Sequence, residues 1–428
     1  MLNSRAGTRS GRSSQSCAVK RDLLATDAPE REGLRLCSSF NNNSLLLAPE
    51  ASAYDVGMNG QWLGRYSGTT SGAMIVNIDE RHDFYRGAAY LIEDDRKLPD
   101  SLTGFQTVNK ESPFEFRTEV ILPLDPINGA GLSLEELKKR YGEDEVWSKY
   151  ADVKGTVDRD SLNMSWVTDT GVIGECVLPR SKADQPSELI AQYRNWDEFR
   201  QYVSGLKESR FLFRGQNKPW RLRTSFHRSG RADLARYLNE DVPALYKHLS
   251  ARTRHVFNRN DPDENGAFFN LIQHHGYPTP LLDWTYSPYV AAFFAYRGIS
   301  NEQAASAEPN AKVRIHIFDQ EQWKKDVSQI LFVVAPRLNL SIGEFLAIEN
   351  ERMIPQQAAS TITNVDDIED YINSMQRNGT VYLWAIDLPV NNRRQVVRDL
   401  TYMGITAGSL FPGLDGACEE LKERNFEI

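Results

Sequence analysis

The chain has few cysteines, and none of them are spaced as metal ligands or redox pairs. It contains four cysteines among 428 residues and no Cys-x-x-Cys pair. This usage argues against a disulfide scaffold and against a thiolate zinc site. Cysteines spread this widely favour a reducing compartment, so we expect a cytoplasmic protein.

Long apolar runs and familiar nucleotide-binding motifs are also missing. The apolar stretches, such as residues 330–336, are far shorter than the roughly 20 residues of a membrane-spanning helix, and no apolar secretory segment follows the first residues. We therefore expect a soluble protein without a membrane partner. Walker A, Rossmann, EF-hand and kinase signatures are absent, and so is the G-x-S-x-G elbow of hydrolases.

Negative charge predominates, but it is unevenly distributed. The net charge is −8, which argues against a protein that coats nucleic acid. Residues 205–260 nevertheless hold 13 Lys and Arg against 4 Asp and Glu, so this segment is +9 and the rest of the chain is −17. Either an anionic partner binds there or the segment is a solvated helical face. Its aromatic residues Phe211, Phe213, Trp220 and Phe226 suit base stacking, which keeps nucleic acid as a candidate partner.

The first half of the chain divides by composition. Residues 1–50 are rich in Ser, Arg, Asn and Gly, which predicts a disordered arm. Residues 52–180 contain short apolar runs, such as 117–122, separated by glycine-containing turns, and this pattern predicts a small antiparallel barrel or sandwich. Ser133 followed by Glu136 predicts one helix start with a capping box within it.

The second half, residues 189–428, follows a polar linker at 182–188 and mixes helices with strands. We expect helices at 196–203, 244–257, 265–275, 391–403 and 414–424, and strands at 211–213, 312–318, 330–335 and 381–388. The expected fold class is therefore α+β, with a β-rich domain followed by a mixed domain.

The first motif that could carry chemistry is Phe213-Arg214-Gly215-Gln216. A strand leads into it, so Arg214 lies near a strand end, and Gly215 permits a ligand or a backbone segment to approach closely. A guanidinium group at that place suits bidentate contact with a phosphate. The alternative is an arginine paired with a carboxylate beside a turn. Arg214 and Gln216 are candidate ligand-binding residues.

The second motif runs from Gln273 to Pro288 and begins with two histidines. His274 and His275 end a helix, where the helix dipole favours their protonated form, and both are candidate ligand-binding residues. Neighbouring helical side chains point about 100° apart, so the pair is poorly placed to share one ion. With no His-x-x-x-His spacing in the chain, we expect no metal.

The same motif continues into a strand, a turn and a helix start. Residues 281–284 read as a short strand, and Ser287 with Pro288 reads as an N-cap followed by proline at the first helical position. Such a corner favours anions. Asp283, Thr285 and Ser287 alternate there, so at least one of these side chains is expected to face the pocket mouth. The alternative for Ser287 is capping alone.

The third motif, residues 349–360, combines two acids, an arginine and two amides around a proline. This set of side chains suits a ribose or an amide-bearing ligand, and Glu351 and Gln356 are its candidates. The alternative is an exposed helix end and loop.

Taken together, these segments resemble the FRG domain family, named for its Phe-Arg-Gly sequence. The resemblance follows the chain in order from about 195 to 424. It rests on Phe213-Arg214-Gly215, Gln273 to Ser287, Ala291 to Ala295, Arg352 to Gln357, Gly404-Ile405, and Leu410 to Gly416. The chain departs from the family pattern at Pro280, where arginine is usual, and at Ala358 and Ser360.

More remotely, the order of the motifs resembles ADP-ribosyltransferases. Those enzymes place Arg on one strand, Ser or Thr on a second, and Glu or Gln on a third. The resemblance implies that Arg214 holds the pyrophosphate of NAD and that Thr285 or Ser287 fixes the nicotinamide ribose. The catalytic candidates are then Glu351, Gln356 and Asp283. Glutamine cannot act as a base, so Gln356 would weaken the transferase interpretation.

Two classes of function stay open after this comparison. The first is an FRG domain that binds a nucleotide-like anionic small molecule and processes NAD as a substrate, by ADP-ribosyl transfer or NAD glycohydrolysis, with no resident cofactor. Analogy places such chains in microbial defence or toxin systems. The alternative is a non-enzymatic module that binds nucleic acid or protein through residues 205–260. The sequence leaves open whether the chain is an enzyme and how many copies assemble.

Overall fold

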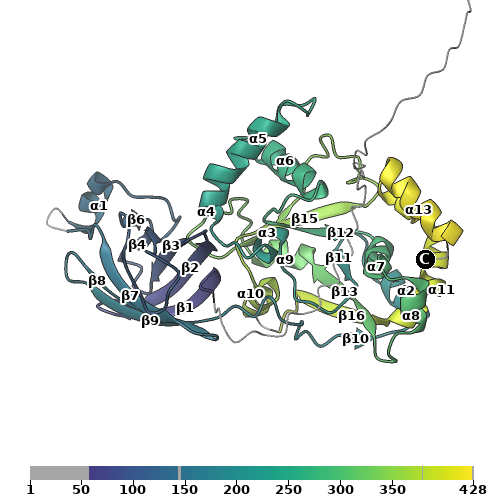
Figure 1. Cartoon of the computed structure of the whole chain (residues 1–428), viewed down its shortest axis with the longest axis horizontal. Helices are drawn as coiled ribbons and strands as arrows, with labels where there is room; N and C mark the ends of the chain where they lie inside the picture. The colour runs from purple at the N-terminus through teal and green to yellow at the C-terminus, as the bar shows by residue number, and fades with distance from the viewer. Residues whose placement is uncertain (1–56, 143–145, 378, 427–428) are drawn as a thin grey trace, which may run out of the picture. The chain divides into compact units, whose positions relative to one another are not determined.

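Two β-sheets organise the part of the chain that the structure describes. The computed structural model describes residues 57–142, 146–377 and 379–426, and these belong to one compact unit. The arm predicted over residues 1–50 lies outside the described residues. A nine-stranded sheet comes first along the chain and a seven-stranded sheet second, each accompanied by helices (Figure 1). The α+β class expected from the sequence is confirmed.

The first sheet is antiparallel throughout, with the order β5-β7-β8-β9-β1-β2-β3-β4-β6. Its strands are β1 (Gly60–Gly68), β2 (Gly72–Glu80), β3 (Tyr85–Glu93), β4 (Asp100–Gln106), β5 (Phe114–Arg117), β6 (Leu122–Leu124), β7 (Ala151–Val157), β8 (Ser161–Thr168) and β9 (Ile173–Pro179).

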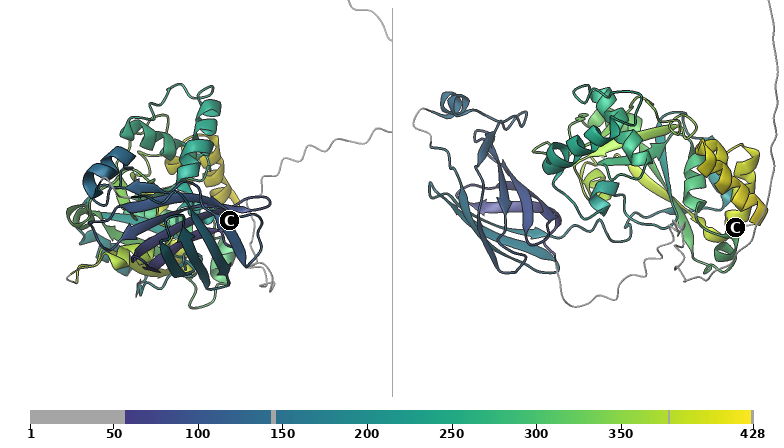
Figure 2. Two further views of the ribbon diagram at one scale, coloured as in Figure 1. Left: turned by 90° about the vertical axis from the view of Figure 1, so that its left-hand side faces the viewer. Right: turned by 45° about the horizontal axis from the view of Figure 1, so that its top comes forward.

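This nine-stranded sheet curls around an apolar interior (Figure 2). Alternating side chains produce the two faces: in β9 every second residue, from Gly174 to Leu178, is buried, while the residues between them are exposed. Glu119, just after β5, donates its backbone N–H to Gly104 in β4 at 2.8 Å, which draws the two ends of the sheet together. Among the described residues β5 and β6 are not paired with each other. The β-rich segment is thus one curled sheet, neither a sandwich nor a fully closed barrel.

Two local predictions in this region had opposite outcomes. Ser133 caps helix α1 (Leu134–Tyr141) in a capping box with Glu136, as its spacing predicts. The strand predicted over residues 117–122 is wrong, because β5 ends at Arg117 and β6 begins only at Leu122. The intervening backbone turns away to bond with Gly104 and Lys149 instead of continuing along one neighbour.

The second sheet has the order β10-β16-β13-β11-β12-β15-β14 and is antiparallel except between β10 and β16. Its strands are β10 (Gln192–Tyr193), β11 (Phe211–Gln216), β12 (Leu281–Thr285), β13 (Lys312–Asp319), β14 (Leu340–Gly343), β15 (Ala358–Thr363) and β16 (Leu383–Pro389).

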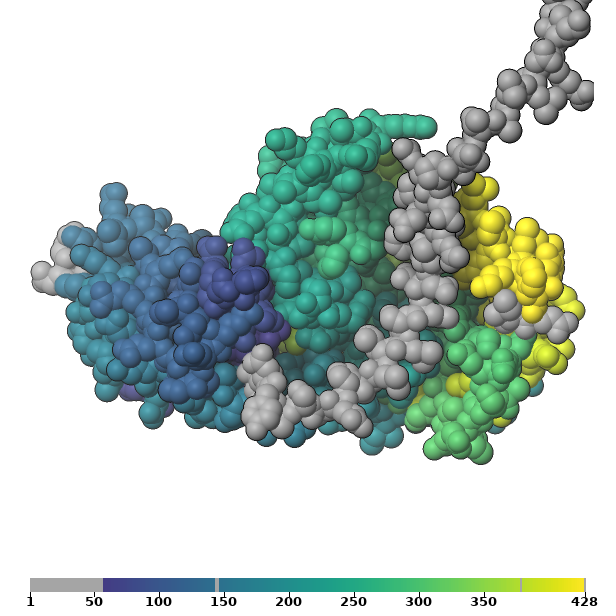
Figure 3. All heavy atoms as spheres, in the orientation of Figure 1, coloured from purple at the N-terminus to yellow at the C-terminus, as the bar shows by residue number. Residues whose placement is uncertain are grey.

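Helices pack on this sheet through three apolar clusters. They are α2 (Trp196–Ser204), α3 (Ser225–Arg228), α4 (Leu234–Arg236), α5 (Val242–Leu249), α6 (Pro262–His274), α7 (Pro288–Tyr296), α8 (Asn301–Ala305), α9 (Gln320–Asp326), α10 (Ile368–Ser374), α11 (Arg393–Tyr402), α12 (Ala407–Leu410) and α13 (Leu414–Phe426). Helices α2, α7 and α11 share one cluster with β11, β13 and β16. Helices α9 and α10 share another with β12, and α6 packs against Leu281 and Ile362. Helix α13 lies at the surface (Figure 3). Within the described ranges, none of the helices has the length and apolar content needed to cross a membrane.

Two predictions in the second half need correction. The apolar run at 330–335 is not a strand: it forms a loop in which Phe332 is 73% exposed, because the side chains of Ser341 and Asn339 bind its backbone. The helix predicted over 244–257 ends at Leu249, whose carbonyl accepts N–H groups of a closing turn. The helices predicted near 196, 265, 391 and 414 and the strands near 211, 312 and 381 are confirmed within a few residues.

The second sheet divides between β11 and β12. These neighbouring strands share a single residue pair, Phe213 with Thr285, whereas β11 pairs with β13 along its whole length. Beyond that pair the backbones of β11 and β12 separate. The gap between them positions the candidate site.

Candidate functional site

A pocket opens where β11 and β12 separate, and we call it the motif pocket. Its volume is about 270 Å³. Nine residues line it: Arg214, Ser225, Arg228, Gln273, Gly276, Tyr277, Leu281, Leu282 and Asp283. They come from β11, helix α3, the end of α6, the turn after it and β12. The Phe-Arg-Gly motif and the first part of the Gln273–Pro288 motif therefore meet here.

Arg214 bridges the gap between the two strands. Its Nη1 donates to the backbone carbonyl of Asp283 at 2.7 Å, and its Nε is buried with no hydrogen-bond partner among the described residues. Burial lowers the pKa of Arg214 to about 10, although the nearby Asp283 carboxylate opposes this shift. Arg214 thus stays protonated at neutral pH. Its bonded partner is a carbonyl and not the carboxylate of the alternative interpretation.

Gly215 has a packing reason to be glycine. A Cβ atom at this position would lie 1.8 Å from the carbonyl oxygen of Ala291 and 2.7 Å from the backbone nitrogen of Ala295. Helix α7 therefore packs with its backbone directly against β11, which only glycine permits. The close approach predicted at this residue is made by a helix of the same chain.

Gln273 and Asp283 are held by a continuous set of hydrogen bonds. The Thr279 hydroxyl, fully buried, accepts the Leu281 N–H at 3.2 Å and donates to Oε1 of Gln273. Nε2 of Gln273 in turn donates to Oδ1 of Asp283. This order fixes which end of the Gln273 amide faces the carboxylate. Asp283 retains Oδ2 for a further partner.

Helix α3 supplies the other polar wall. The Ser225 hydroxyl accepts the Thr279 N–H at 3.0 Å and donates to the Thr279 carbonyl at 3.3 Å, which joins α3 to the turn before β12. Arg228 lies at the exposed mouth. The pocket wall lowers the pKa of Arg228 by desolvation, while Asp283 favours its charged form. The motif pocket therefore holds two guanidinium groups and one carboxylate.

Further buried polar atoms without partners lie beside Arg214. His316 faces Arg214 across the β11–β13 pairing and is fully buried, with Nε2 3.3 Å from Oε1 of Glu369 but outside hydrogen-bond geometry. Burial lowers the pKa of His316, so its ring is neutral at pH 7. Gln216, predicted to bind ligand, is half-buried with an unpaired Oε1 and does not line the motif pocket.

Thr285 and Ser287, the predicted ribose-binding residues, are engaged with backbone groups. The Thr285 hydroxyl donates to the Gln356 carbonyl at 2.7 Å and accepts the Ser287 N–H at 3.0 Å. The Ser287 hydroxyl accepts the Val290 N–H at 3.3 Å and so caps α7, as its sequence position predicts. Both residues are buried, and neither lines the motif pocket.

The remaining predicted residues also lie outside the pocket lining. Nδ1 of His274 is 2.8 Å from Oδ1 of Asn350, and His275 is exposed at the end of α6. Glu351 is exposed, whereas Gln356 is buried and donates from Nε2 to the Leu410 carbonyl at 2.9 Å. Thr285, Gln356 and Leu410 thus tie three motif segments together. Of the predicted site residues, Arg214 and Asp283 meet in one pocket.

Nearly half of the basic side chains in the segment 205–260 are neutralised within the fold. Six of its 13 basic side chains form ion pairs with carboxylates: Lys207, Arg210, Arg221, Arg223, Arg231 and Arg236. Of its four aromatic residues, Phe211, Phe213 and Phe226 are buried, and only Trp220 is exposed, at 47%. Most of the predicted stacking surface therefore belongs to the core.

Four polar residues of the pocket region were not singled out from the sequence. Gln273 and Thr279 lie inside the recognised motif. Their spacing of six residues across a turn was the one feature of the sequence that could have indicated a contact between them. Ser225 and Arg228 belong to a helix of four residues that carries no periodic pattern. Their position depends on Ser225 binding the Thr279 backbone, a contact between residues 54 positions apart.

Comparison with known protein families gives a match in this region. No curated protein and no solved structure matches the chain. The FRG domain family matches residues 209–304. All nine residues that line the motif pocket lie within that range. The resemblance seen in the sequence is therefore confirmed over residues 209–304, and this segment of the chain is an FRG domain.

Proposed function

We propose that the motif pocket binds a phosphate-bearing, nucleotide-like ligand. The observation that carries this proposal is Arg214, a half-buried side chain whose Nε is buried and unpaired and which has no carboxylate within ion-pair distance among the described residues. A buried charge is destabilising unless it is paired. A ligand phosphate would supply the missing anion through charge-assisted hydrogen bonds. Arg228, at the mouth, would contact the same group from the opposite wall.

Asp283 gives the pocket a group that could recognise the sugar of the ligand, in addition to the phosphate. Its Oδ1 is occupied by Gln273, and Oδ2 is left to accept a ribose hydroxyl. Drug-sized ligands occupy pockets of roughly 300–1,000 Å³, and the motif pocket is slightly smaller, at about 270 Å³. It therefore suits the phosphoribosyl part of a nucleotide, with the remainder of the ligand outside.

The reaction that these groups support best is cleavage of NAD, either by water or by transfer to an acceptor. The bond between ribose C1′ and the nicotinamide nitrogen breaks, and its electron pair leaves with nicotinamide. Water or an acceptor group then attacks C1′ of the oxocarbenium ion and gives up a proton. Asp283 would stabilise the positive charge and accept that proton. In this scheme Asp283, and not Glu351 or Gln356, is the catalytic candidate.

Binding and turnover of NAD by the full chain test the proposal. We expect NAD and ADP-ribose to bind the wild type, with release of nicotinamide detected by chromatography. Arg214→Ala should abolish binding, and Arg214→Lys should weaken it strongly, because lysine loses the fork of the guanidinium. Arg254→Ala, an exposed arginine of the same basic segment, is the matched control. Absence of binding by the wild type, or binding unaffected by Arg214→Ala, would overturn the proposal.

A second variant separates binding from chemistry. Asp283→Asn keeps the shape of the side chain and its acceptor for Gln273, so we expect NAD binding within a few-fold of wild type. Nicotinamide release should fall at least 100-fold, the usual range for loss of a general base. Glu351→Gln should leave both unchanged, because Glu351 is exposed outside the pocket lining. The opposite result would return the catalytic assignment to Glu351.

The alternative function is nucleic-acid binding without catalysis, and one observation favours it. Lys247, Arg252 and Arg254, at the end of α5 and just after it, are exposed. Three phosphate contacts predict that the logarithm of the association constant falls with the logarithm of salt concentration with a slope of about −3. A duplex-binding titration over salt measures it. A slope near zero, or affinity unchanged in Arg254→Ala, would remove this alternative.

A further inference from the structure

The interior of the nine-stranded sheet contains a cavity that its own core does not fill. Its volume is about 230 Å³. Its wall is mainly apolar and includes Met74, Val76, Leu91, Phe105 and Val153. An engineered apolar cavity of about 150 Å³ stays dry and binds benzene. The space inside the sheet is therefore large enough for an aromatic ring that carries a short chain.

Two buried polar atoms in this cavity lack hydrogen bonds of acceptable geometry. They are the Tyr66 hydroxyl oxygen and Oε2 of Glu93. Tyr66 is only 4% exposed. The other oxygen of Glu93, Oε1, accepts the Thr70 hydroxyl at 3.0 Å. Tyr66 and Glu93 lie close enough to influence each other's pKa, yet no bond of acceptable geometry joins them. Because buried polar groups are normally satisfied, a ligand group placed between the two atoms would supply the missing bonds.

The sheet register explains why the two side chains meet. Tyr66 in β1 and Glu93 in β3 both pair with Gly72, which lies between them in β2. A Cβ at Gly72 would lie 2.9 Å from Cε1 of Tyr66 and 2.1 Å from the Ile92 carbonyl oxygen. Glycine thus lets the tyrosine ring lie over the middle strand and brings the hydroxyl toward the carboxylate. Burial raises the pKa of Tyr66 and of Glu93, so the phenol keeps the proton that it can donate.

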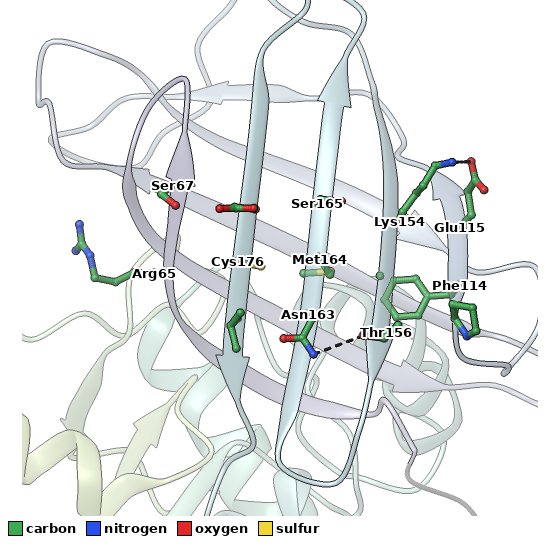
Figure 4. Close-up of a pocket in the computed structure, with 14 residues that line it drawn as sticks. Arg65, Ser67, Phe114, Glu115, Lys154, Thr156, Asn163, Met164, Ser165 and Cys176 are labelled. Carbon is green, nitrogen blue, oxygen red and sulfur yellow. Dashed lines mark hydrogen bonds and ion pairs between the residues drawn. The ribbon is translucent and has the colours of Figure 1, made fainter.

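The outer side of the same sheet provides a useful contrast. A wide, open depression there contains two pairs of polar side chains that bind each other (Figure 4). Lys154 pairs with Glu115 at 3.2 Å, and Asn163 donates to Thr156 at 3.5 Å. These groups need no external partner. Of these two spaces, the interior cavity is the one that combines a mainly apolar wall with buried polar atoms that lack hydrogen bonds of acceptable geometry.

We propose that the nine-stranded sheet binds a small molecule with an apolar ring or short chain and one hydroxyl or amide head. The head accepts a hydrogen bond from the Tyr66 hydroxyl and donates one to Glu93, while the body occupies the apolar space. A head that only accepts, or only donates, leaves one of the two buried atoms unsatisfied. This site is separate from the motif pocket and does not depend on the proposed reaction with NAD.

Two neutral probes of equal size test the proposal on the full chain. 2-Phenylethanol carries the hydroxyl head, and propylbenzene replaces it with a methyl group. Calorimetry and the fluorescence of Trp147 and Trp166, which line the cavity, report binding. We expect the alcohol to bind about tenfold more tightly than propylbenzene to the wild type. Tyr66→Phe and Glu93→Met should each weaken the alcohol about tenfold and leave propylbenzene unchanged.

A matched pair of substitutions places the probes in the cavity. Ala89→Leu adds volume to the wall, whereas Ala88→Leu adds the same volume on the opposite face of β3. We expect Ala89→Leu to abolish binding of both probes and Ala88→Leu to keep it, with thermal melting showing that each variant is folded. If neither probe binds the wild type, or if the alcohol binds Tyr66→Phe and Glu93→Met as well as wild type, the proposal is overturned.

Discussion

The two sheets differ in where they hold polar groups. In the nine-stranded sheet β2 pairs with β3 over its whole length, from Gly72 to Glu80, and the interior is apolar apart from a few atoms at one cavity. In the seven-stranded sheet β11 and β12 share one pair, and the surrounding strands bury charged side chains such as Arg314 and Asp387. A continuous ladder leaves no space for chemistry between its strands. Where two neighbouring strands separate, as β11 and β12 do, a pocket forms that main-chain groups and charged side chains can both line.

The largest effect on stability is expected from a substitution at the contact that joins the two sheet regions. Asp79 of β2 is 1% exposed and accepts hydrogen bonds from Arg231 at 2.9 Å and Arg236 at 3.1 Å, and from the N–H groups of Ala232 and Asp233. Asp79→Ala leaves the two backbone N–H groups without their acceptor and removes the buried carboxylate of both arginines, which keep only the more exposed Asp241 and Glu240. We expect a loss of about 3–5 kcal/mol in the free energy of unfolding, measured by urea denaturation.

The neighbouring residue supplies the control for Asp79. Glu80 pairs with Lys110, but its side chain is 50% exposed. Glu80→Ala should therefore change the stability by less than about 0.5 kcal/mol. Equal effects of the two substitutions would mean that the buried cluster contributes no more than a surface ion pair.

The second effect is a pH dependence that belongs to the seven-stranded region. His227 of α3 is fully buried, its Nδ1 lies 2.7 Å from the Thr224 hydroxyl, and burial lowers its pKa to about 4. In the unfolded chain histidine titrates near pH 6.5. The unfolded state therefore binds a proton between pH 6.5 and 4 while the native state does not. The contribution to stability is complete above pH 6.5 and decreases by about 3 kcal/mol as the pH falls to 4.

Unfolding curves at several pH values measure this contribution. His227→Gln should flatten the fall in stability between pH 6.5 and 4, so that wild type and variant converge at the acidic end. His248→Gln, on the exposed side of α5, should keep the slope of the wild type. His316, also fully buried with a lowered pKa, adds a further dependence of the same sign in all three proteins. An unchanged slope in His227→Gln would contradict the assignment.

The same contrast explains what the sequence could predict. Alternating apolar residues and local capping signals depend on neighbours in the chain, so the β-rich region, the Ser133 cap and the Ser287 cap were predictable. The separation of β11 from β12 depends on contacts between segments that are distant in the chain. The position of Arg228 in the pocket could therefore not be predicted from the sequence. The apolar run at 330–335 misled because polar side chains from β14 and the residue before it, Asn339, hold it as a loop. Arg214 and Asp283 both line the motif pocket, and this juxtaposition was visible only in the fold.

A moderate effect tests the internal order of the motif pocket. Thr279→Val keeps the size of the side chain but removes the hydroxyl that joins the Leu281 N–H to Gln273. Because both groups are then unsatisfied, we expect a loss of about 2 kcal/mol in stability. Gln273 also loses the bond that orients it toward Asp283, so affinity for NAD should fall as well. Thr401→Val, on the exposed face of α11, is the matched control and should change neither quantity.

The smallest effect decides between two roles for Ser287. The hydroxyl caps α7 by accepting the Val290 N–H at 3.3 Å, and the side chain lies outside the lining of the motif pocket. Ser287→Ala should therefore lower the stability by about 1 kcal/mol, the usual value for a lost N-cap, and leave the affinity for NAD unchanged. Ser204→Ala, an exposed serine at the end of α2, should change neither. If Ser287→Ala instead weakens NAD binding while the stability is unchanged, the ribose-binding role implied by the remote family resemblance holds, and the ligand extends past the separation of the strands to the start of α7.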